Sequence, residues 1–396
     1  MRAGGSFYPG MPTKLMNKLR VVLWGCLAVW LALELGMRVV RVSHPRFWCT
    51  DPEVGHVLRA GASGWYEDEG EGYVSINEQG MRDRPRAIER PKGAMRIAVL
   101  GDSMTEADSV EFNECYAAQL QVALTSRAEL VSRRVEVMNF GVSGYSTGQE
   151  LLLFRHKVAA FKPDIVLVCF NAANDIRENC GELGGAQLRP YFRLDGKTLV
   201  VDERFRTALA QRGFVRPFLW LLDAVSDWSR VVQWLAWKAG RAGLPQAQPD
   251  ANGVVADDRA FAPSPDDTWR EAWVITERLF ITLRDECTAA GARLMVVSST
   301  YGPQVDPDPK VRDALAQRLG VGDLLYPDVR LAPFLVGNGI PYLPLATNFQ
   351  RQALEKKVQF HGFEKDGTIG RGHWNKDGHA LAAKLIVPWL LQHLSQ

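Results

Sequence analysis

The sequence has few of the features that mark specialised classes of protein. Its six cysteines are scattered, and no pair has the Cys-x-x-Cys spacing of zinc or redox sites, so we expect no metal centre. The formal net charge is only +2, and no basic tract or RNA-type aromatic motif is present, so we expect no nucleic-acid partner. Internal repeats are absent. With 46% hydrophobic and 23% charged residues, the composition is that of an ordinary globular protein.

One apolar run, at the N-terminus, is long enough to cross a membrane. Residues 21–33 are uncharged, and Lys14, Lys18 and Arg20 precede them. Extended to Val40, the run reaches the roughly 20 residues that a bilayer-spanning helix needs. We interpret residues 1–20 as a cytoplasmic tail and 21–40 as a single-pass anchor. A cleaved signal peptide is the alternative, although no small-x-small cleavage site follows the run. Basic residues are denser before the span, which favours a bulk domain outside the cytoplasm.

Beyond a connector at residues 41–94, apolar strands alternate with helices. The connector has short strand candidates, including a hairpin or edge extension at residues 72–77. We predict strands at residues 96–100, 135–140, 164–170, 293–298 and 342–345, and helices at 114–130, 149–161, 268–290, 311–319 and 376–394. Near-continuous apolar strands separated by helices are typical of a parallel sheet covered on both faces. We therefore predict an α/β fold over residues 95–396, a flavodoxin-like three-layer α/β/α sandwich with a mainly parallel five-stranded sheet.

An insertion at about residues 178–267 interrupts this pattern. Its part at residues 214–242 is rich in tryptophan and places apolar residues on one helical face. We expect this stripe to pack on the domain; docking on a membrane interface is the alternative.

Polar residues follow three predicted strands and gather again near the C-terminus. Gly101-Asp102-Ser103 ends the first strand, where open α/β sheets build their sites. Ser103 is placed there as a nucleophile, or as a helix N-cap. The segments at residues 139–146 and 170–175 supply glycine and asparagine, which can donate hydrogen bonds to an oxyanion. Residues 372–379 supply two histidines, and histidine is the usual base for a serine nucleophile.

In these segments the chain resembles the SGNH (GDSL-type) hydrolase superfamily. The resemblance implies that Ser103 is the nucleophile and that its backbone N–H is the first oxyanion donor. It implies that Gly144 gives a backbone N–H, Asn174 a side-chain donor, and His373 the general base. His379 is a weaker candidate for the base. The segment at residues 76–83 and the anchor resemble a membrane-anchored bacterial branch, which implies an inner-membrane protein facing the periplasm.

One position departs from the family's pattern. The acid that orients the histidine is an Asp two or three residues before it, and this chain has Gly370 and Arg371 there. Asp366 folding back is one option. A carbonyl or water beside His373, giving a Ser–His dyad, is the second, and an impaired site is the third.

The resemblance implies esterase chemistry without a metal or organic cofactor. The substrate would be a small-molecule or glycan ester, such as the O-acetyl groups of a cell-envelope glycan. An O-acyltransferase of an envelope polysaccharide would use the same residues. A non-catalytic glycan-binding protein on the same fold is the alternative from another class. The sequence gives no oligomeric state.

Overall fold

A five-stranded, fully parallel sheet forms the centre of the computed structural model, which describes residues 13–127, 134–186, 188–196, 198–211, 216–241 and 254–394. The strand order is β11-β10-β7-β5-β6. In order along the chain this is the 2-1-3-4-5 arrangement of the flavodoxin-like fold. The strands are β5 (Ala94–Gly101), β6 (Arg134–Asn139), β7 (Ile165–Phe170), β10 (Arg293–Ser298) and β11 (Tyr342–Pro344). The predicted fold class is confirmed.

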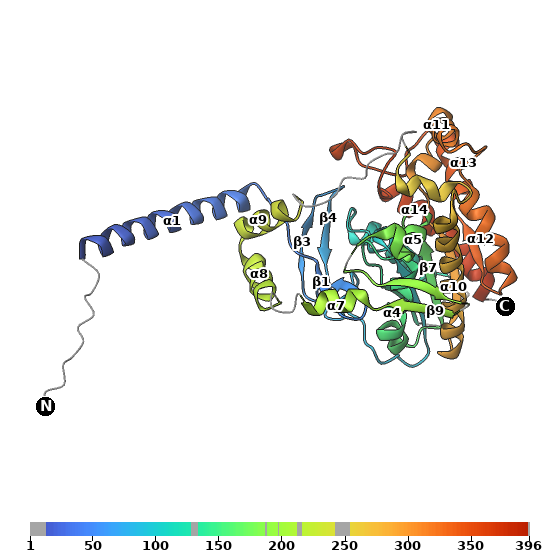
Figure 1. Ribbon diagram of the computed structural model, residues 1–396, viewed down its shortest axis with the longest axis horizontal. Coiled ribbons are helices and arrows are strands. Elements are labelled where there is room, and N and C mark those ends of the chain that lie inside the picture. The colour runs from blue at the N-terminus through green and yellow to red at the C-terminus, as the bar shows by residue number, and fades with distance from the viewer. Residues whose placement is uncertain are drawn as a thin grey trace.

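Helices cover both faces of this sheet (Figure 1). Alternate residues along β5 serve two separate cores: Ile97 and Val99 lie in one, and Ala98 and Leu100 in the other. The first core is closed by α3 (Tyr116–Thr125), α13 (Ala346–Lys356) and α14 (Lys376–Leu394). The second is closed by α4 (Thr147–His156), α10 (Asp267–Ala289) and α12 (Tyr326–Gly337). Burial on both faces explains why these strands are apolar without alternation.

Two helices of these layers, α12 and α13, were not among the predicted elements. Both contain features that obscure a helical pattern in sequence: α12 has Pro333 inside it, and α13 has a mostly polar exposed side. They are held by the tertiary core, through Leu331 and Leu335 in α12 and Phe349 in α13, which are fully buried.

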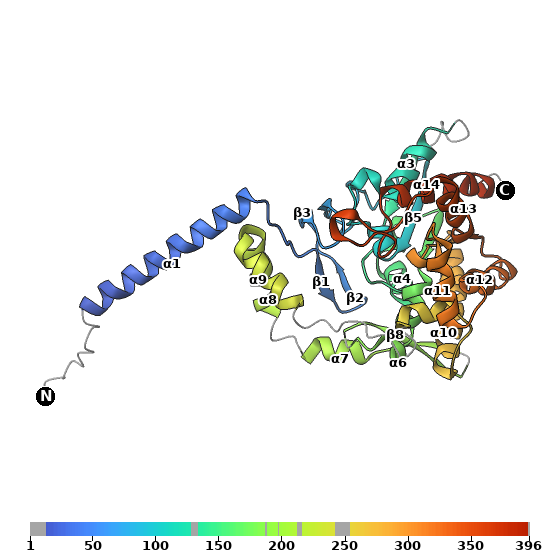
Figure 2. The same cartoon turned by 90° about the horizontal axis from the view of Figure 1, so that it is seen from above.

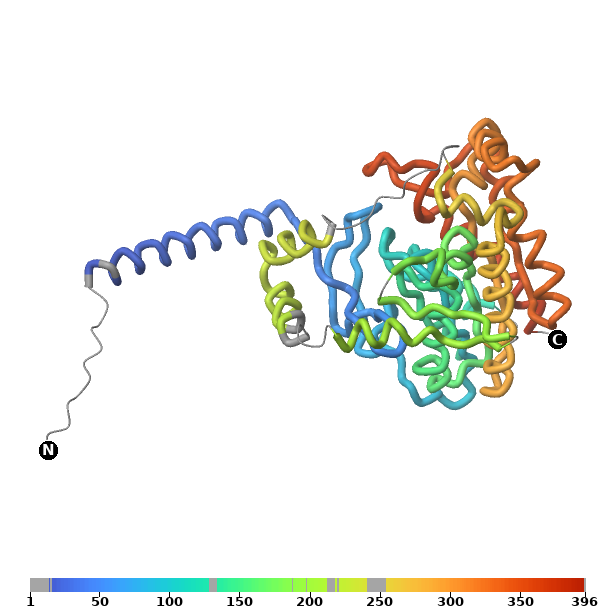
Figure 3. Tube along the Cα trace, viewed as in Figure 1, coloured from blue at the N-terminus to red at the C-terminus, as the bar shows by residue number. Residues whose placement is uncertain are grey.

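The connector forms two antiparallel hairpins that lie between the N-terminal helix and the sheet domain (Figure 3). They are β1 (Trp48–Asp51) with β2 (Gly55–Leu58), and β3 (Ser63–Tyr66) with β4 (Gly72–Ser75). The second includes the predicted hairpin at residues 72–77. Its turn, residues 67–71, contacts the segment before α14, since the Gly70 N–H donates to Asp366 at 2.6 Å.

The N-terminal helix α1 (Thr13–Val39) projects away from the rest of the molecule (Figure 2). Its segment Met16–Val39 is long and apolar enough to cross a membrane, and none of it is buried against the protein. By length and composition it serves equally as a membrane anchor or as a signal sequence.

The insertion after β7 adds several smaller elements. They are α5 (Ala172–Asn179), α6 (Gly181–Gly184), the hairpin β8 (Tyr191–Asp195) with β9 (Thr198–Asp202), α7 (Arg204–Gln211), α8 (Arg216–Trp228) and α9 (Arg230–Arg241). The expectation that its apolar stripe packs on the domain is wrong for most of the stripe. Leu221, Val225, Trp228 and Leu235 are exposed, because the polar side of these helices faces the protein instead.

Candidate active site

Ser103 lies at the carboxyl end of β5, as the first residue of the short helix α2 (Ser103–Glu106). The turn into this helix requires Gly101, since a Cβ there would lie 2.1 Å from Thr105 Oγ1. Asp102 caps the helix by accepting a 2.8 Å hydrogen bond from the Met104 N–H. The alternative in which Ser103 is the N-cap is therefore wrong, and its hydroxyl is left for another partner.

That partner is His373, which follows a loop and precedes α14. The distance from His373 Nε2 to Ser103 Oγ is 2.7 Å. On the other side of the ring, His373 Nδ1 lies 2.6 Å from Glu69 Oε2, and the His373 backbone N–H donates to Glu69 Oε1 at 3.0 Å. A neutral imidazole that donates its Nδ1–H to Glu69 has its Nε2 lone pair directed at the seryl hydroxyl. Ser103, His373 and Glu69 thus form a hydrogen-bonded row.

The carboxylate beside His373 is Glu69 and not Asp366, which corrects the expectation from sequence. Asp366 Oδ2 instead accepts a 2.6 Å hydrogen bond from the backbone N–H of Gly70. Asp366 therefore holds the turn that carries Glu69 and contacts the site only through that turn. The close approach of Glu69 requires Gly372: a Cβ at that position, where φ is +71°, would lie 1.9 Å from Glu69 Oε1.

The charges around His373 favour its protonated form. Burial lowers the pKa of His373, but the hydrogen bond and charge of Glu69, together with Asp108 and Asp102, outweigh it and raise the pKa to about 9. Burial raises the pKa of Glu69, and its bonds to His373 more than offset this and hold it below its usual range. The two shifts are the two sides of one ion pair, which is stabilised when the imidazole is charged.

His379 is not placed as the base. Its ring is fully buried and lies parallel to that of Tyr116, with ring centroids 6.1 Å apart. Its Nδ1 accepts the Tyr116 N–H at 3.4 Å, so the histidine joins α14 to α3. Burial and the nearby charges of Arg82 and His373 lower its pKa to about 3, which keeps the ring neutral.

Asn174 reaches the site through Asp102. Its Nδ2 donates to Asp102 Oδ2 at 3.0 Å, and the Nδ2 of Asn171 donates to the same oxygen at 2.8 Å. Asp102 precedes Ser103, so these bonds tie the end of β7 to the nucleophile turn at the place where the strand order reverses. The second N–H of Asn174 makes no hydrogen bond within the described part of the chain.

Gly144 lies in the loop after β6, which packs on α2. A Cβ at Gly141 would lie 2.4 Å from the Glu106 nitrogen, and the Ser143 N–H donates to Glu106 Oε2 at 2.6 Å. The Gly144 carbonyl accepts a hydrogen bond from Arg189, which is itself paired with Glu178. Over the described ranges, the backbone N–H groups of Gly144 and Ser103 have no protein acceptor. Two backbone N–H donors without protein acceptors are therefore available, one at the start of α2 and one in the loop that packs on α2.

A buried arginine from the connector binds the backbone at the C-terminal end of α2. The Arg82 guanidinium, 1% exposed, donates to the carbonyls of Glu106, Ala107 and Val110. The connector is thus part of the site: it supplies both Glu69 and this support.

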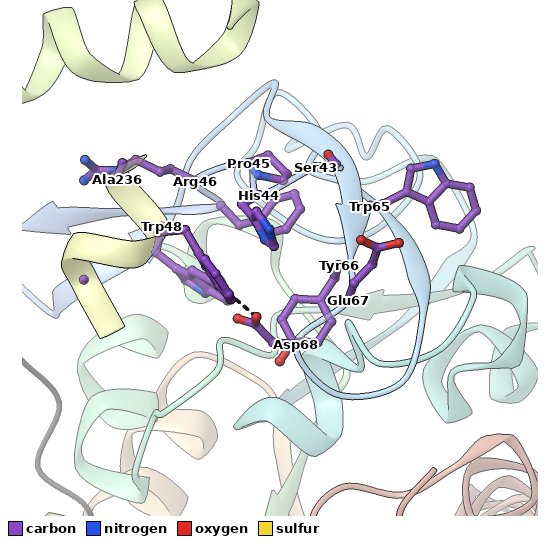
Figure 4. Close-up of a pocket in the computed structure, with 13 residues that line it drawn as sticks. Ser43, His44, Pro45, Arg46, Trp48, Trp65, Tyr66, Glu67, Asp68 and Ala236 are labelled. Atoms are coloured by element: carbon purple, nitrogen blue, oxygen red, sulfur yellow. Dashed lines mark hydrogen bonds between the residues drawn. The ribbon is translucent and has the colours of Figure 1, made fainter. Parts of the chain in front are cut away.

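A cavity of about 650 Å³ lies between the connector and α9 (Figure 4), and Asp68, the residue before Glu69, is one of the residues that line it. Its walls come from residues 43–48 and 65–68 of the connector and from residues 236, 237 and 240 of α9. Trp48, which lines it, donates from Nε1 to Glu106 Oε2 at 3.2 Å. Trp237 Nε1 donates to Asp68, the residue before Glu69, at 2.9 Å. The cavity therefore lies next to residues that contact Glu106 and the turn that carries Glu69, and it is rich in aromatic rings.

Sequence reasoning missed Glu69, Arg82 and Arg189. The only signals for Glu69 were the absence of Asp at the usual positions and an acidic run, Glu67-Asp68-Glu69, in the connector. No motif connects this run to His373, since 304 residues separate the two.

No protein-family model matches the chain, and no curated protein matches it. Among solved structures, the acetyl xylan esterase AlAXEase is 11% identical, with a TM-score of 0.37 over 74% of this chain and 98% of that one. A catalytic mutant of the acetylxylan esterase Axe2 from Geobacillus stearothermophilus is 12% identical, with a TM-score of 0.38 over 75% and 94%.

A two-domain esterase active on acetylated mannans is 11% identical, with a TM-score of 0.39 over 76% of this chain and 50% of that one. Likenesses at these scores carry no argument about activity. The order and direction of the five strands define the fold.

Proposed function

We propose that this chain is a membrane-anchored serine esterase of the SGNH type, which removes acyl groups from an ester of the cell envelope. The observation that carries the proposal is the row of Glu69, His373 and Ser103, with distances of 2.6 and 2.7 Å between successive polar atoms. A carboxylate, an imidazole and a hydroxyl in this order are recognised as a catalytic triad by geometry and not by sequence position.

The reaction begins with attack of Ser103 Oγ on the ester carbonyl carbon. His373 Nε2 takes the hydroxyl proton, and Glu69 holds the imidazole in the required tautomer and stabilises its charge. The N–H groups of Ser103 and Gly144 and the Nδ2 of Asn174 donate to the oxyanion. Each such donor contributes about 2.7–4 kcal/mol to lowering the barrier.

The tetrahedral intermediate collapses when His373 returns its proton to the leaving alcohol oxygen, which leaves the acyl group on Ser103. A water molecule then loses a proton to His373 and attacks the acyl carbon. His373 returns this proton to Ser103 Oγ as the bond between Oγ and the acyl carbon breaks, and the acid is released. No atom in this cycle requires a cofactor.

The substrate we favour is an O-acetylated glycan, and two features support it. The aromatic cavity beside Glu69 offers flat apolar surfaces against which the apolar face of a sugar ring can pack. The helix α1 would keep the site within reach of polymers at the membrane, and we infer an inner-membrane location with the sheet domain in the periplasm.

A site without an acid beside His373 would favour a non-catalytic glycan-binding role, and the 2.6 Å contact between Glu69 and His373 Nδ1 argues against that role. Transfer to a sugar hydroxyl would follow the same steps, with the acceptor in place of water. The geometry by itself favours neither acceptor over the other.

The test is hydrolysis of p-nitrophenyl acetate by the full chain in detergent, with Ser103→Ala beside the wild type. We expect the substitution to lower kcat/KM on the order of 10⁴-fold. Equal rates for the two proteins would exclude the mechanism. O-acetylated xylo- and manno-oligosaccharides then test the substrate class: free acetate identifies an esterase, and acetylated acceptor without free acetate identifies a transferase.

A further inference from the structure

The helices α8 and α9 form a hairpin at the C-terminal end of α1, between α1 and the rest of the protein (Figure 1). Both helices are amphipathic. In a protein surrounded by water, the apolar side of such a helix faces the core and the charged side faces the solvent. In α8 this arrangement is reversed, whereas α9 buries Val231 and exposes Leu235.

The outward face of α8 is apolar. Phe218, Leu221, Val225 and Trp228 follow one another at intervals of three and four residues, which places them on one side of the helix. They are 65%, 53%, 40% and 81% exposed. Leu235 of α9 is 51% exposed as well. Single exposed apolar residues are common, but a continuous stripe of this kind marks an interaction surface.

The inward face of α8 is acidic and bonded to the connector. Asp223 pairs with Arg46 at 3.0 Å, and Asp227 receives two hydrogen bonds from Arg59, at 2.8 and 2.6 Å. The orientation of the helix is thus fixed by ion pairs, and it cannot turn its apolar stripe inward without breaking them.

The hairpin is also fixed to α1. Glu34, near the C-terminal end of α1, accepts hydrogen bonds from the Arg230 N–H at 3.0 Å, the Ser229 hydroxyl at 2.9 Å and the Val231 N–H at 3.3 Å. A carboxylate of one helix therefore caps the first turn of the other, a position where negative charge is stabilising. If α1 crosses a bilayer, Glu34 lies near the end of the span Met16–Val39, which places the hairpin at the membrane surface.

We propose that the apolar face of the α8–α9 hairpin lies in the headgroup layer of the same bilayer that α1 crosses. The adjoining cations Arg38 and Lys238 would face the lipid phosphates. Lys238 lies over the ring of Trp234, and tryptophan beside lysine is the composition that favours a membrane interface. The sheet domain is then held at a fixed orientation, with the aromatic cavity near the membrane surface. The inference rests on the anchoring part of the proposed function and not on its chemistry.

The experiment places an environment-sensitive fluorophore at single cysteines in the full chain. The chain is reconstituted into vesicles of phosphatidylcholine and phosphatidylglycerol that carry a spin-labelled lipid. In a background with Cys26→Ser and Cys49→Ser, the sites are Leu221→Cys, Trp228→Cys and the control Val329→Cys. Val329 is a 68% exposed valine on α12. A fourth protein keeps Cys26, on the exposed surface of α1, as its reactive site and reports insertion of that helix.

We expect at least a twofold quenching of the fluorophores at positions 221, 228 and 26, and none at 329. If the fluorophore at position 26 is quenched but those at positions 221 and 228 are quenched no more than the one at 329, the docking proposal is wrong and the membrane anchor is still supported. Positions 221 and 228 shielded only at high protein concentration would overturn it in favour of a second copy of the chain. No quenching at 26 would overturn both the docking and the anchor. Hydrolysis of p-nitrophenyl acetate by the same variants reports the chemistry separately.

Discussion

At the scale of single residues, the site depends on which carboxylate meets His373. Glu69 makes two hydrogen bonds to that residue, one to the ring and one to the backbone, whereas the Asp366 carboxylate accepts from the turn that carries Glu69. The distinction gives the two acids different roles. Glu69 stabilises the charged imidazole directly, and Asp366 positions Glu69.

Replacing each acid by its amide separates these roles. The base must be neutral to accept the seryl proton, and the pKa of His373 is raised to about 9, so kcat/KM of the wild type should rise with pH toward that value. Glu69→Gln removes the carboxylate that raises this pKa. We expect the rising limb to move to lower pH and the plateau to fall on the order of 10³–10⁴-fold.

Asp366→Asn is the matched control, since its side-chain oxygen can still accept from the Gly70 N–H. We expect it to lose less than about tenfold in rate and to keep the pH profile of the wild type. A profile that moves with Asp366→Asn and stays in place with Glu69→Gln would reverse the assignment of the acid.

At the scale of elements, the loop before α14 decides whether the row can form. His361 Nδ1 lies 2.8 Å from the Gly372 carbonyl, to which it can donate, and Asn375 caps the first turn of α14 through the N–H groups of Asp377 and Gly378. The loop therefore holds His373 from both sides. The space for Glu69 comes from the missing side chain of Gly372.

Two glycines of this loop provide a matched pair of substitutions. Both have a positive φ, +71° at Gly372 and +64° at Gly367, so alanine strains the backbone similarly at each. Only at Gly372 would the new Cβ meet Glu69, while nothing lies within 4 Å at Gly367. We expect the two variants to unfold at similar temperatures, with kcat lowered at least about 100-fold in Gly372→Ala alone. Similar kcat values for the two variants would show that the clash with Glu69 is relieved while Ser103, His373 and Glu69 keep their hydrogen bonds.

At the scale of the whole molecule, the domain buries carboxyl groups beneath the site. Glu150 of α4 is 1% exposed, and neither of its oxygens has a hydrogen-bond partner in the described ranges. Burial and the charge of Asp102 raise its pKa well above its ordinary value. In the unfolded chain the Glu150 carboxyl has a pKa of about 4.3. Over a range of pH above this value, the carboxyl is therefore protonated in the folded protein and ionised in the unfolded chain.

This difference makes stability fall as pH rises. The contribution of Glu150 is complete below the unfolded pKa and is lost progressively above it, because the unfolded state then binds fewer protons than the folded state. Glu150→Gln removes the titration. We expect the Tm of this variant, relative to the wild type, to increase steadily between pH 5 and pH 9 in thermal unfolding.

Glu355→Gln, at an exposed position on α13, serves as the control and should follow the wild type at every pH. A constant difference in Tm between Glu150→Gln and the wild type across this range would show that Glu150 does not titrate with a raised pKa.

The sequence by itself determined the strands, the strand ends and the residues that follow them. The strand predicted at residues 293–298 has the same first and last residues as the observed β10. Such a strand can be predicted because burial on both faces requires a nearly continuous apolar run in the local sequence. The order of Ser103, Asn174 and His373 along the chain also followed from local motifs, and the fold brings Ser103 and His373 into contact.

Only the tertiary structure decided the acid and the orientation of the hairpin. Glu69 lies in a part of the connector that has no motif, and its place beside His373 depends on how the β3–β4 turn packs against a loop 304 residues away. The α8–α9 stripe has the same periodicity whether it faces a core or a membrane. Its direction is set by ion pairs with the connector and by the cap from Glu34, and contacts over such distances have no signature in local sequence.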